Sequence, residues 1–320
     1  MTGRWKPVIR LLIIAVVIAG LLWAVRSAVD ELVSDPDKRR LLWRIHWPSL
    51  WGGAGAYLLA LLPAGFYWYW VLRSFAVPVP AGRAVAAHVQ GHLGKYVPGK
   101  AMVVVLRVGA IVGPGVSPLL ATVAVFIETL TMMATGATLA ALVIALSDVP
   151  QELIPLAIAL GLVSAVPTMP PLFRMVVAVV VRRRDPSHRA PLEAYRWTTF
   201  AAGWAWMTLS WCLIGTAFAL IVHAIAPQTG LDDLVLAAAL MALAVVAGFV
   251  SLIPGGAGVR ELILTAALAP RIGTAEALSA ALLARLVFLA VELAAAGGSA
   301  VVLRRTGPRD SVSEQPSNRG

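Results

Sequence analysis

Long apolar runs dominate this chain, and short polar stretches or stretches rich in Pro and Gly separate them. Six runs contain about 18 residues or more, and they cover residues 8–25, 50–72, 118–146, 197–225, 234–253 and 275–303. At a rise of about 1.5 Å per residue, each can cross a hydrocarbon core of roughly 30 Å as a helix. The pattern predicts an all-α polytopic membrane protein with about six full spans.

Composition and charge agree with a membrane protein. The chain is 59% hydrophobic and 13% charged, whereas a soluble domain carries about 25% charged residues. The net charge of +10 does not indicate nucleic-acid binding, because the basic residues lie at the ends of the apolar runs, where they face anionic lipid. The single cysteine, Cys212, excludes an intrachain disulfide and a Cys-based metal site.

The distribution of Lys and Arg predicts the topology. Loops 147–151 and 226–233 contain neither residue, so we expect them outside the cell. The N-terminal end, the central loop and the C-terminal tail are basic and are expected on the cytoplasmic side. The membrane is expected to be the cell (inner or plasma) membrane. The basic residues of these three regions are Arg4, Lys6, Arg10, Arg174, Arg182, Arg183, Arg184, Arg189, Arg196, Arg304, Arg305, Arg309 and Arg319.

The beginning of the chain fits this topology less well. Run 8–25 is interpreted as an uncleaved first span, because its apolar core is long and no clear cleavage site follows it. The next segment, 26–47, is expected outside and yet contains five basic residues beside four acidic ones. Its "LLWRIHWPSLW" pattern is typical of an interfacial helix anchored by Trp.

A helix-breaking Pro-Gly motif occurs twice. "GKYVPGKAMVVVLRVGAIVGPG" covers residues 94–115, and "SLIPGGAGVREL" covers residues 251–262. Pro98 and Pro254 are 156 residues apart, and so are Pro114 and Pro270. Because each motif lies between two long apolar runs, the spacing predicts an internal repeat.

An extra span between the two motifs predicts that the repeats have inverted topology, as in many transporters. This span ends near residue 166 at "VPTMPP", and an amphipathic segment follows it. The apolar arms around Pro98 are too short to span and suit a re-entrant hairpin, whereas the first arm of the Pro254 motif is long enough to cross. The predicted organisation is one transmembrane domain (1–305) with repeats at 49–146 and 197–303, a linking span at 152–181 and a disordered cytoplasmic tail at 306–320.

Six ionisable side chains fall inside the predicted membrane region: Arg107, Glu128, Arg260, Glu261, Arg285 and Glu292. An unpaired charge at the bilayer centre costs at least about 2.5–3.5 kcal/mol, so these groups should face inward and pair. One interpretation is that they form buried ion pairs that hold helices together. The other is an anionic-headgroup site flanked by carboxylates that carry protons.

The second break is the strongest candidate for such a site. Pro254 removes an N–H group, and Gly255, Gly256 and Gly258 permit non-helical turns. The break leaves backbone N–H donors at the start of a helix near residue 259. We expect these donors, together with Arg260, to hold an anion.

The remaining motifs give weaker evidence for a metal or a nucleotide site. His88 and His92 share a helix face, but Val89 stands where a zinc protease would have Glu. "GAGVRE" departs from the dinucleotide-binding pattern, and no nucleotide-binding G-x-x-x-x-G-K-[ST] motif is present. We therefore expect no metal and no cofactor.

The two Pro-Gly motifs resemble those of a known family. "GHLGKYVPGKAMVVVLR" and "SLIPGGAGVRE" are similar to the two signatures of the flippase-like family, also known as the lysylphosphatidylglycerol synthase transmembrane region. The resemblance covers about residues 49–303. Arg285 matches the Arg of the family's last span, and Glu128 stands at the usual Glu-Arg pair, where Thr129 replaces the Arg. The first signature adds these candidate binding residues: Lys95, Tyr96, Pro98, Gly99 and Lys100.

The resemblance implies a membrane-embedded region that moves lipids between leaflets. In multiple peptide resistance factors this region is joined to an aminoacyl-transferase domain, for which the 320 residues leave no room, so lysyl transfer is not expected. The leading hypothesis is a non-enzymatic translocator of an anionic, zwitterionic or polyprenyl-phosphate-linked lipid, with its site at the repeat interface. The alternatives are a membrane-embedded enzyme acting on lipid headgroups and a non-transporting partner of cell-envelope lipid-modifying enzymes.

Overall fold

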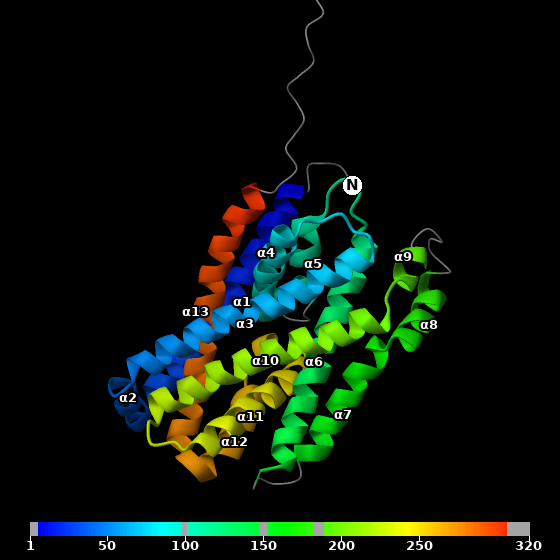
Figure 1. Ribbon diagram of the computed structural model, residues 1–320. Coiled ribbons are helices and arrows are strands. Elements are labelled where there is room, and N and C mark those ends of the chain that lie inside the picture. The colour runs from blue at the N-terminus through cyan, green and yellow to red at the C-terminus, as the bar shows by residue number, and fades with distance from the viewer. Residues whose placement is uncertain (1–5, 98–100, 148–152, 182–188, 306–320) are drawn as a thin grey trace, which may run out of the picture.

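The computed structural model is a bundle of long helices (Figure 1), and it describes residues 6–97, 101–147, 153–181 and 189–305. Within these residues there is no strand, and five helices are long and apolar enough to cross a membrane. The five are α3 (Trp47–Ser74), α6 (Pro118–Ala145), α10 (Trp197–Ile225), α11 (Leu231–Val250) and α13 (Thr274–Arg305). The predicted all-α polytopic membrane fold is confirmed.

The chain begins with α1 (Lys6–Ser34), a helix of 29 residues that packs on α13 and the connection between α4 and α5. The segment predicted to form one interfacial helix, 41–51, is divided instead between the end of the short helix α2 (Pro36–Trp43), a turn and the beginning of α3. α2 begins where the Asp35 side chain accepts a bond of 2.9 Å from the Asp37 N–H group. Trp43 is 90% exposed, and Trp47 and Trp51 at the start of α3 are also exposed. Exposed Trp side chains at a helix end suit the predicted contact with the membrane interface.

The order of elements occurs twice along the chain. A long helix, a broken helical hairpin and a second long helix follow one another in each half. The first set is α3, α4 (Ala81–Gly91), η1 (His92–Tyr96), α5 (Ala101–Ile111) and α6, and the second is α10, α11, η4 (Pro254–Gly256), α12 (Val259–Ile272) and α13. We name α4, η1 and α5 the first hairpin, and α11, η4 and α12 the second hairpin.

The linking segment lies between the two sets. It consists of α7 (Leu153–Ala165), the turn η2 (Val166–Thr168), α8 (Pro170–Val181) and α9 (Arg189–Glu193). The turn falls at the "VPTMPP" stretch, as predicted, because proline cannot continue the hydrogen-bond ladder of a helix. α7 packs on α6 and turns away from the bundle into α8 and α9.

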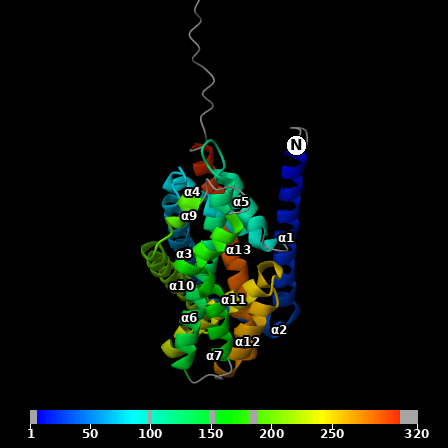
Figure 2. The same ribbon diagram turned by 90° about the vertical axis from the view of Figure 1, so that its right-hand side faces the viewer.

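The two hairpins enter the bundle from opposite ends (Figures 1 and 2). The first hairpin occupies the end at which α13 finishes, and the second occupies the end at which α13 begins. Their connections meet inside the bundle, where η1 contacts η4. The η1 turn, which directly precedes the Pro-Gly of the first motif, and the break of the second motif are therefore neighbours in space.

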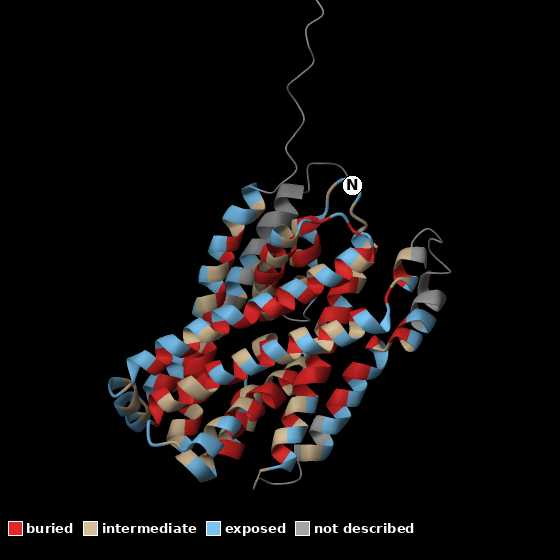
Figure 3. Cartoon of the chain, in the orientation of Figure 1, coloured by how far each residue is buried: buried red, intermediate tan, exposed pale blue. Residues whose placement is uncertain are grey.

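α3 and α10 cross the bundle side by side on the face seen in Figure 1. Ser210 donates a hydrogen bond of 2.8 Å to the Ala60 carbonyl across this contact. Buried residues run along both helices (Figure 3), and the largest of them include Tyr67, Trp68 and Phe218. The hairpins pack around this pair in a reciprocal way: α4 lies against α13, and α11 lies against α6.

Candidate functional site

A buried carboxylate marks the place where the two hairpins meet. Glu292 of α13 is 0% exposed and accepts hydrogen bonds from Tyr57 of α3 and from Lys95 and Tyr96 of η1. The Tyr96 hydroxyl lies 3.1 Å from Glu292 Oε2, and His92 Nδ1 lies 3.9 Å from Glu292 Oε1. We name these five residues the Glu292 cluster. Its members come from three elements, so it exists only when the first hairpin is inserted.

The second hairpin closes over this cluster. The Tyr96 ring lies against the backbone of Gly255, since a Cβ atom there would be 3.4 Å from the ring. Gly255, Gly256 and Gly258 all have positive φ angles, of 60°, 68° and 81°, which side chains with a Cβ atom rarely adopt. The glycines of the second motif thus permit both the turn and the close approach.

A second buried pair lies deeper in the first hairpin. Arg107 of α5 forms an ion pair with Glu128 of α6, and both side chains are buried. Thr129 Oγ1 also donates to Glu128, over 3.2 Å. The Glu128 carboxylate thus has a cationic partner on α5 and a hydroxyl donor on its own helix.

His88 of α4 adjoins the Glu292 cluster through His92. Their Nε2 atoms are 3.1 Å apart, and His88 is fully buried. Within the described part of the chain, no group of three or more His, Cys, Asp or Glu side chains is placed to hold a metal ion. The pair of rings thus extends the Glu292 cluster from η1 to α4.

The third buried pair belongs to the second hairpin. Glu261 of α12 accepts a bond of 2.7 Å from the Gly258 N–H group and pairs with Arg285 Nη1 of α13 at 3.3 Å. α12 begins at Val259 as predicted. However, the carboxylate of Glu261 takes the Gly258 N–H donor at this helix start, so the chain itself caps an end that we expected an anion to occupy.

Arg260 points away from its neighbour Glu261. Its Nη2 lies 3.6 Å from the Met241 sulfur, and its stem passes between Gly248 and Gly256, where a Cβ on either glycine would be 3.1 Å from Arg260 Cγ. The side chain is half-buried, and no carboxylate among the described residues forms an ion pair with it. Arg260 therefore retains a charge with which to hold an anion.

The six ionisable residues predicted inside the membrane thus fall into three buried ion-pair groups and one arginine, Arg260, outside them. Arg285 and Glu292, which share one face of α13, belong to different groups. Pro98, Gly99 and Lys100 lie outside the described residues. Sequence reasoning missed Tyr57 and His92 as members of the Glu292 cluster. The signal available for Tyr57 was a phenol within an apolar run, since a buried hydroxyl needs a partner.

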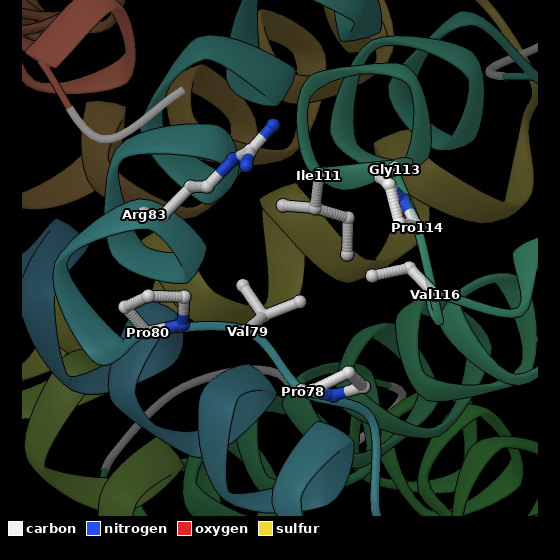
Figure 4. A pocket seen from close by; sticks show the side chains of 8 residues that line it. All are labelled: Pro78, Val79, Pro80, Arg83, Ile111, Gly113, Pro114 and Val116. Atoms are coloured by element: carbon white, nitrogen blue, oxygen red, sulfur yellow. The ribbon is translucent and has the colours of Figure 1, made fainter. Parts of the chain in front are cut away.

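A small apolar cavity of about 230 Å³ lies at the base of the first hairpin. Val79, Ile111 and Val116 point towards one another into it (Figure 4). Arg83 beside it donates to the Ala110 carbonyl from Nε and Nη2, over 3.2 and 3.1 Å. This contact ties the beginning of α4 to the end of α5 and holds the hairpin closed at its base.

Comparison with known protein families gives a match over most of the chain. The family model described as "Lysylphosphatidylglycerol synthase TM region" matches residues 8–296, which is most of the chain. A search of curated proteins finds no match. The matched range includes both hairpins and all three buried ion-pair groups.

Proposed function

The chain belongs to the lysylphosphatidylglycerol synthase TM region family, and from this membership and the geometry of its buried charges we propose that it moves a lipid between membrane leaflets. The family and the membrane-spanning helices together indicate a membrane protein that handles lipids. The lipid we propose carries an anionic, zwitterionic or polyprenyl-phosphate-linked headgroup. The proposed path passes the place where the two hairpins meet.

The observation that carries the proposal is the contact between η1 and η4 beside the Glu292 cluster. Interrupted helices expose backbone polar groups, which are tolerated at membrane depth only within protein or beside a wet cavity. Transporters place their binding sites at such interruptions. Here the interruptions bring together a buried carboxylate, a lysine, two tyrosines and the half-buried Arg260, which suits a polar headgroup.

We further propose that the halves are inverted-topology repeats, at about 49–146 and 197–303, joined by a linking segment at 152–181. Three observations support this: the same element order occurs twice, the hairpins enter from opposite ends, and their contacts with α6 and α13 are reciprocal. The Lys/Arg distribution supports an orientation with both termini in the cytoplasm, and the membrane we propose is the plasma membrane.

One observation favours a second candidate, a non-transporting partner of lipid-modifying enzymes. Glu128, Glu261 and Glu292 each form an ion pair. Buried pairs of this kind are also found where charges only hold helices together. In that case, the charges would have no role in lipid movement.

Reconstitution separates the two candidates. The full chain is placed in liposomes with fluorescent lipids of different headgroups, and the fraction reached by an external quencher is followed over time. We expect the protein to accelerate the exchange of at least one lipid relative to protein-free liposomes. No acceleration for any headgroup, with protein that is folded and inserted, would refute translocation and favour the partner role.

A further inference from the structure

A cavity of about 580 Å³ lies between α1 and α12, which both pack on α13. α1 contributes Trp23 to its wall, α12 contributes Leu262 and Thr265, and α13 contributes Arg285. The cavity is therefore on the flank of the second hairpin, and Gly258 and Glu261 at the capped start of α12 also line it. Neither the Glu292 cluster nor Arg260 forms part of its wall.

Arg285 presents one unused edge in this wall. The residue is only 7% exposed, and its Nη1 donates to Glu261. Its guanidinium carbon lies 5.8 Å from the centre of the Trp23 ring. The buried Nε and Nη2 atoms have no hydrogen-bond partner among the described residues. These two nitrogens form one side of the planar guanidinium, which is the fork that binds two oxygens of a phosphate or carboxylate.

Thr265 offers another donor in the same cavity. Its Oγ1 atom is buried and likewise has no partner among the described residues. Buried polar groups in proteins are almost always hydrogen-bonded, so several unpaired donors in the wall of one cavity indicate a missing acceptor. A tetrahedral oxyanion can accept from the Arg285 fork and from a hydroxyl together.

The local charges permit an anion here although Glu261 itself lines the cavity. The Glu261 carboxylate already accepts from the Gly258 N–H group at the positive end of α12. Arg285 is therefore not its only source of compensation, and part of the guanidinium charge remains available. Glu31 also lines the cavity, but it lies eight residues beyond Trp23 on α1, which is about 12 Å along the helix axis.

The rim indicates that the anion belongs to a lipid. Leu262 is 70% exposed, and Trp23 and Ile253 beside the cavity are exposed as well. In a protein surrounded by hydrocarbon, such side chains contact acyl chains. A soluble ion would have to cross this apolar rim, whereas a lipid can place its chains along α1 and α12 and its headgroup inside.

We propose that this flank cavity binds the phosphate group of a membrane lipid, held by the Nε/Nη2 edge of Arg285 and by the hydroxyl of Thr265. The inference rests on the proposed function, because it names the phosphate as the part of the translocated lipid that the protein binds. The site lies beside the hairpin contact and not within it, so it is a holding site on the membrane-facing flank.

Binding is measured on the full-length protein in detergent, from the saturable rise in melting temperature as ligand is added. The probes are dioleoyl-phosphatidylglycerol, dioleoylglycerol with the same chains and no phosphate, and inorganic phosphate. We expect stabilisation by the phospholipid alone. Equal stabilisation by dioleoylglycerol would overturn the phosphate contact, and equal stabilisation by inorganic phosphate would overturn the assignment to a lipid.

Substitutions place the binding at this cavity. Arg285→Lys keeps a charge for Glu261 and loses the fork, so the phospholipid should bind at least about tenfold more weakly. Thr265→Val keeps the shape and loses the donor, with an expected weakening of about tenfold. Arg271→Lys is the matched control for the change from Arg to Lys. Arg271 lies on α12, as Thr265 does, pairs with Asp233 at 2.9 Å and does not line the cavity. Wild-type affinity in both cavity variants would overturn the proposal.

The liposome assay keeps the two proposals distinguishable. If the wild type moves lipid but phospholipid binding does not depend on Arg285 or Thr265, the flank site is wrong and translocation stands. If binding depends on both residues but no lipid moves, translocation is wrong and the protein holds lipid without moving it.

Discussion

At the scale of single residues, the buried charges are the feature that the membrane makes expensive. Glu292 is fully buried and accepts from three donors. Its negative charge is balanced by Lys95, which is thereby partly removed from water. Such a pair stabilises little relative to apolar residues, but breaking it leaves a buried charge without compensation. The pair can therefore be tested by removing one partner and then both.

We predict that Glu292→Gln lowers the free energy of unfolding by about 3 kcal/mol, because it leaves Lys95 charged and half-buried. The double variant Glu292→Gln/Lys95→Met should recover much of this loss. Thermal unfolding in detergent measures both. The control is Asp30→Asn at the exposed Arg26–Asp30 pair, where the change should stay within about 0.5 kcal/mol. Equal losses at the two sites would contradict the assigned burial.

Arg260 is tested by lipid binding and not by stability, because no carboxylate among the described residues forms an ion pair with it. If it holds an anionic headgroup, Arg260→Ala should weaken lipid binding about 10- to 150-fold, which corresponds to about 1.5–3 kcal/mol. Arg260→Lys should retain part of the binding, since the charge remains without the fork. Titration with labelled lipid in nanodiscs measures the effect. Unchanged binding in Arg260→Ala would remove this residue from the site.

At the scale of elements, the second hairpin depends on its glycines. Gly258 precedes α12 with a φ of 81°, and a Cβ atom added there would meet nothing within 4 Å. The requirement for glycine at this position is thus one of backbone conformation and not of space. Gly297 within α13 also has open space around it, and its φ is not positive.

The two glycines form a matched pair of substitutions. Gly258→Ala should lower the free energy of unfolding by about 1–2 kcal/mol, because a Cβ atom makes the left-handed conformation unfavourable. Gly297→Ala should be neutral or stabilising by up to about 1 kcal/mol, since alanine favours a helix. Thermal unfolding of both variants under the same conditions makes the comparison. A harmless Gly258→Ala would mean that the break can adopt another conformation.

At the scale of the whole molecule, the proposed inversion has a direct consequence for topology. The extra span between the repeats should place loops 147–151 and 226–233 on one side of the membrane, and the central loop and tail on the other. The hairpins entering from opposite ends agree with this arrangement. The positions that report on it lie in loops, where a small label is tolerated.

We predict that single cysteines at Asp148 and Gln228 react with an impermeant reagent from outside the cell. Cysteines at Arg183 and Thr306 should react only after the membrane is opened. The experiment needs Cys212→Ser as its background, because Cys212 is exposed. Labelling of Asp148 and Arg183 from the same side would refute the inverted repeats.

The sequence by itself determined the class of protein and the positions of its breaks. Apolar runs long enough to span must be helical in lipid, since only helices and closed barrels satisfy the backbone there. Proline and glycine interrupt a helix locally, so the turn at residues 166–168 and the start of α12 at Val259 could be predicted from the positions of Pro and Gly in the sequence. The prediction that buried charges pair rested on the same physics of a medium without water.

Only the tertiary structure decided which charges pair. Glu292 meets Lys95 across 197 residues of sequence, and Arg285 meets Glu261 because α12 and α13 pack together. Arg260 and Glu261 are adjacent in sequence and yet part, because consecutive residues on a helix point about 100° away from each other. The partners of a buried charge depend on how helices cross and how deeply a hairpin inserts. Those quantities arise from packing over the whole bundle, and no local pattern in the chain contains them.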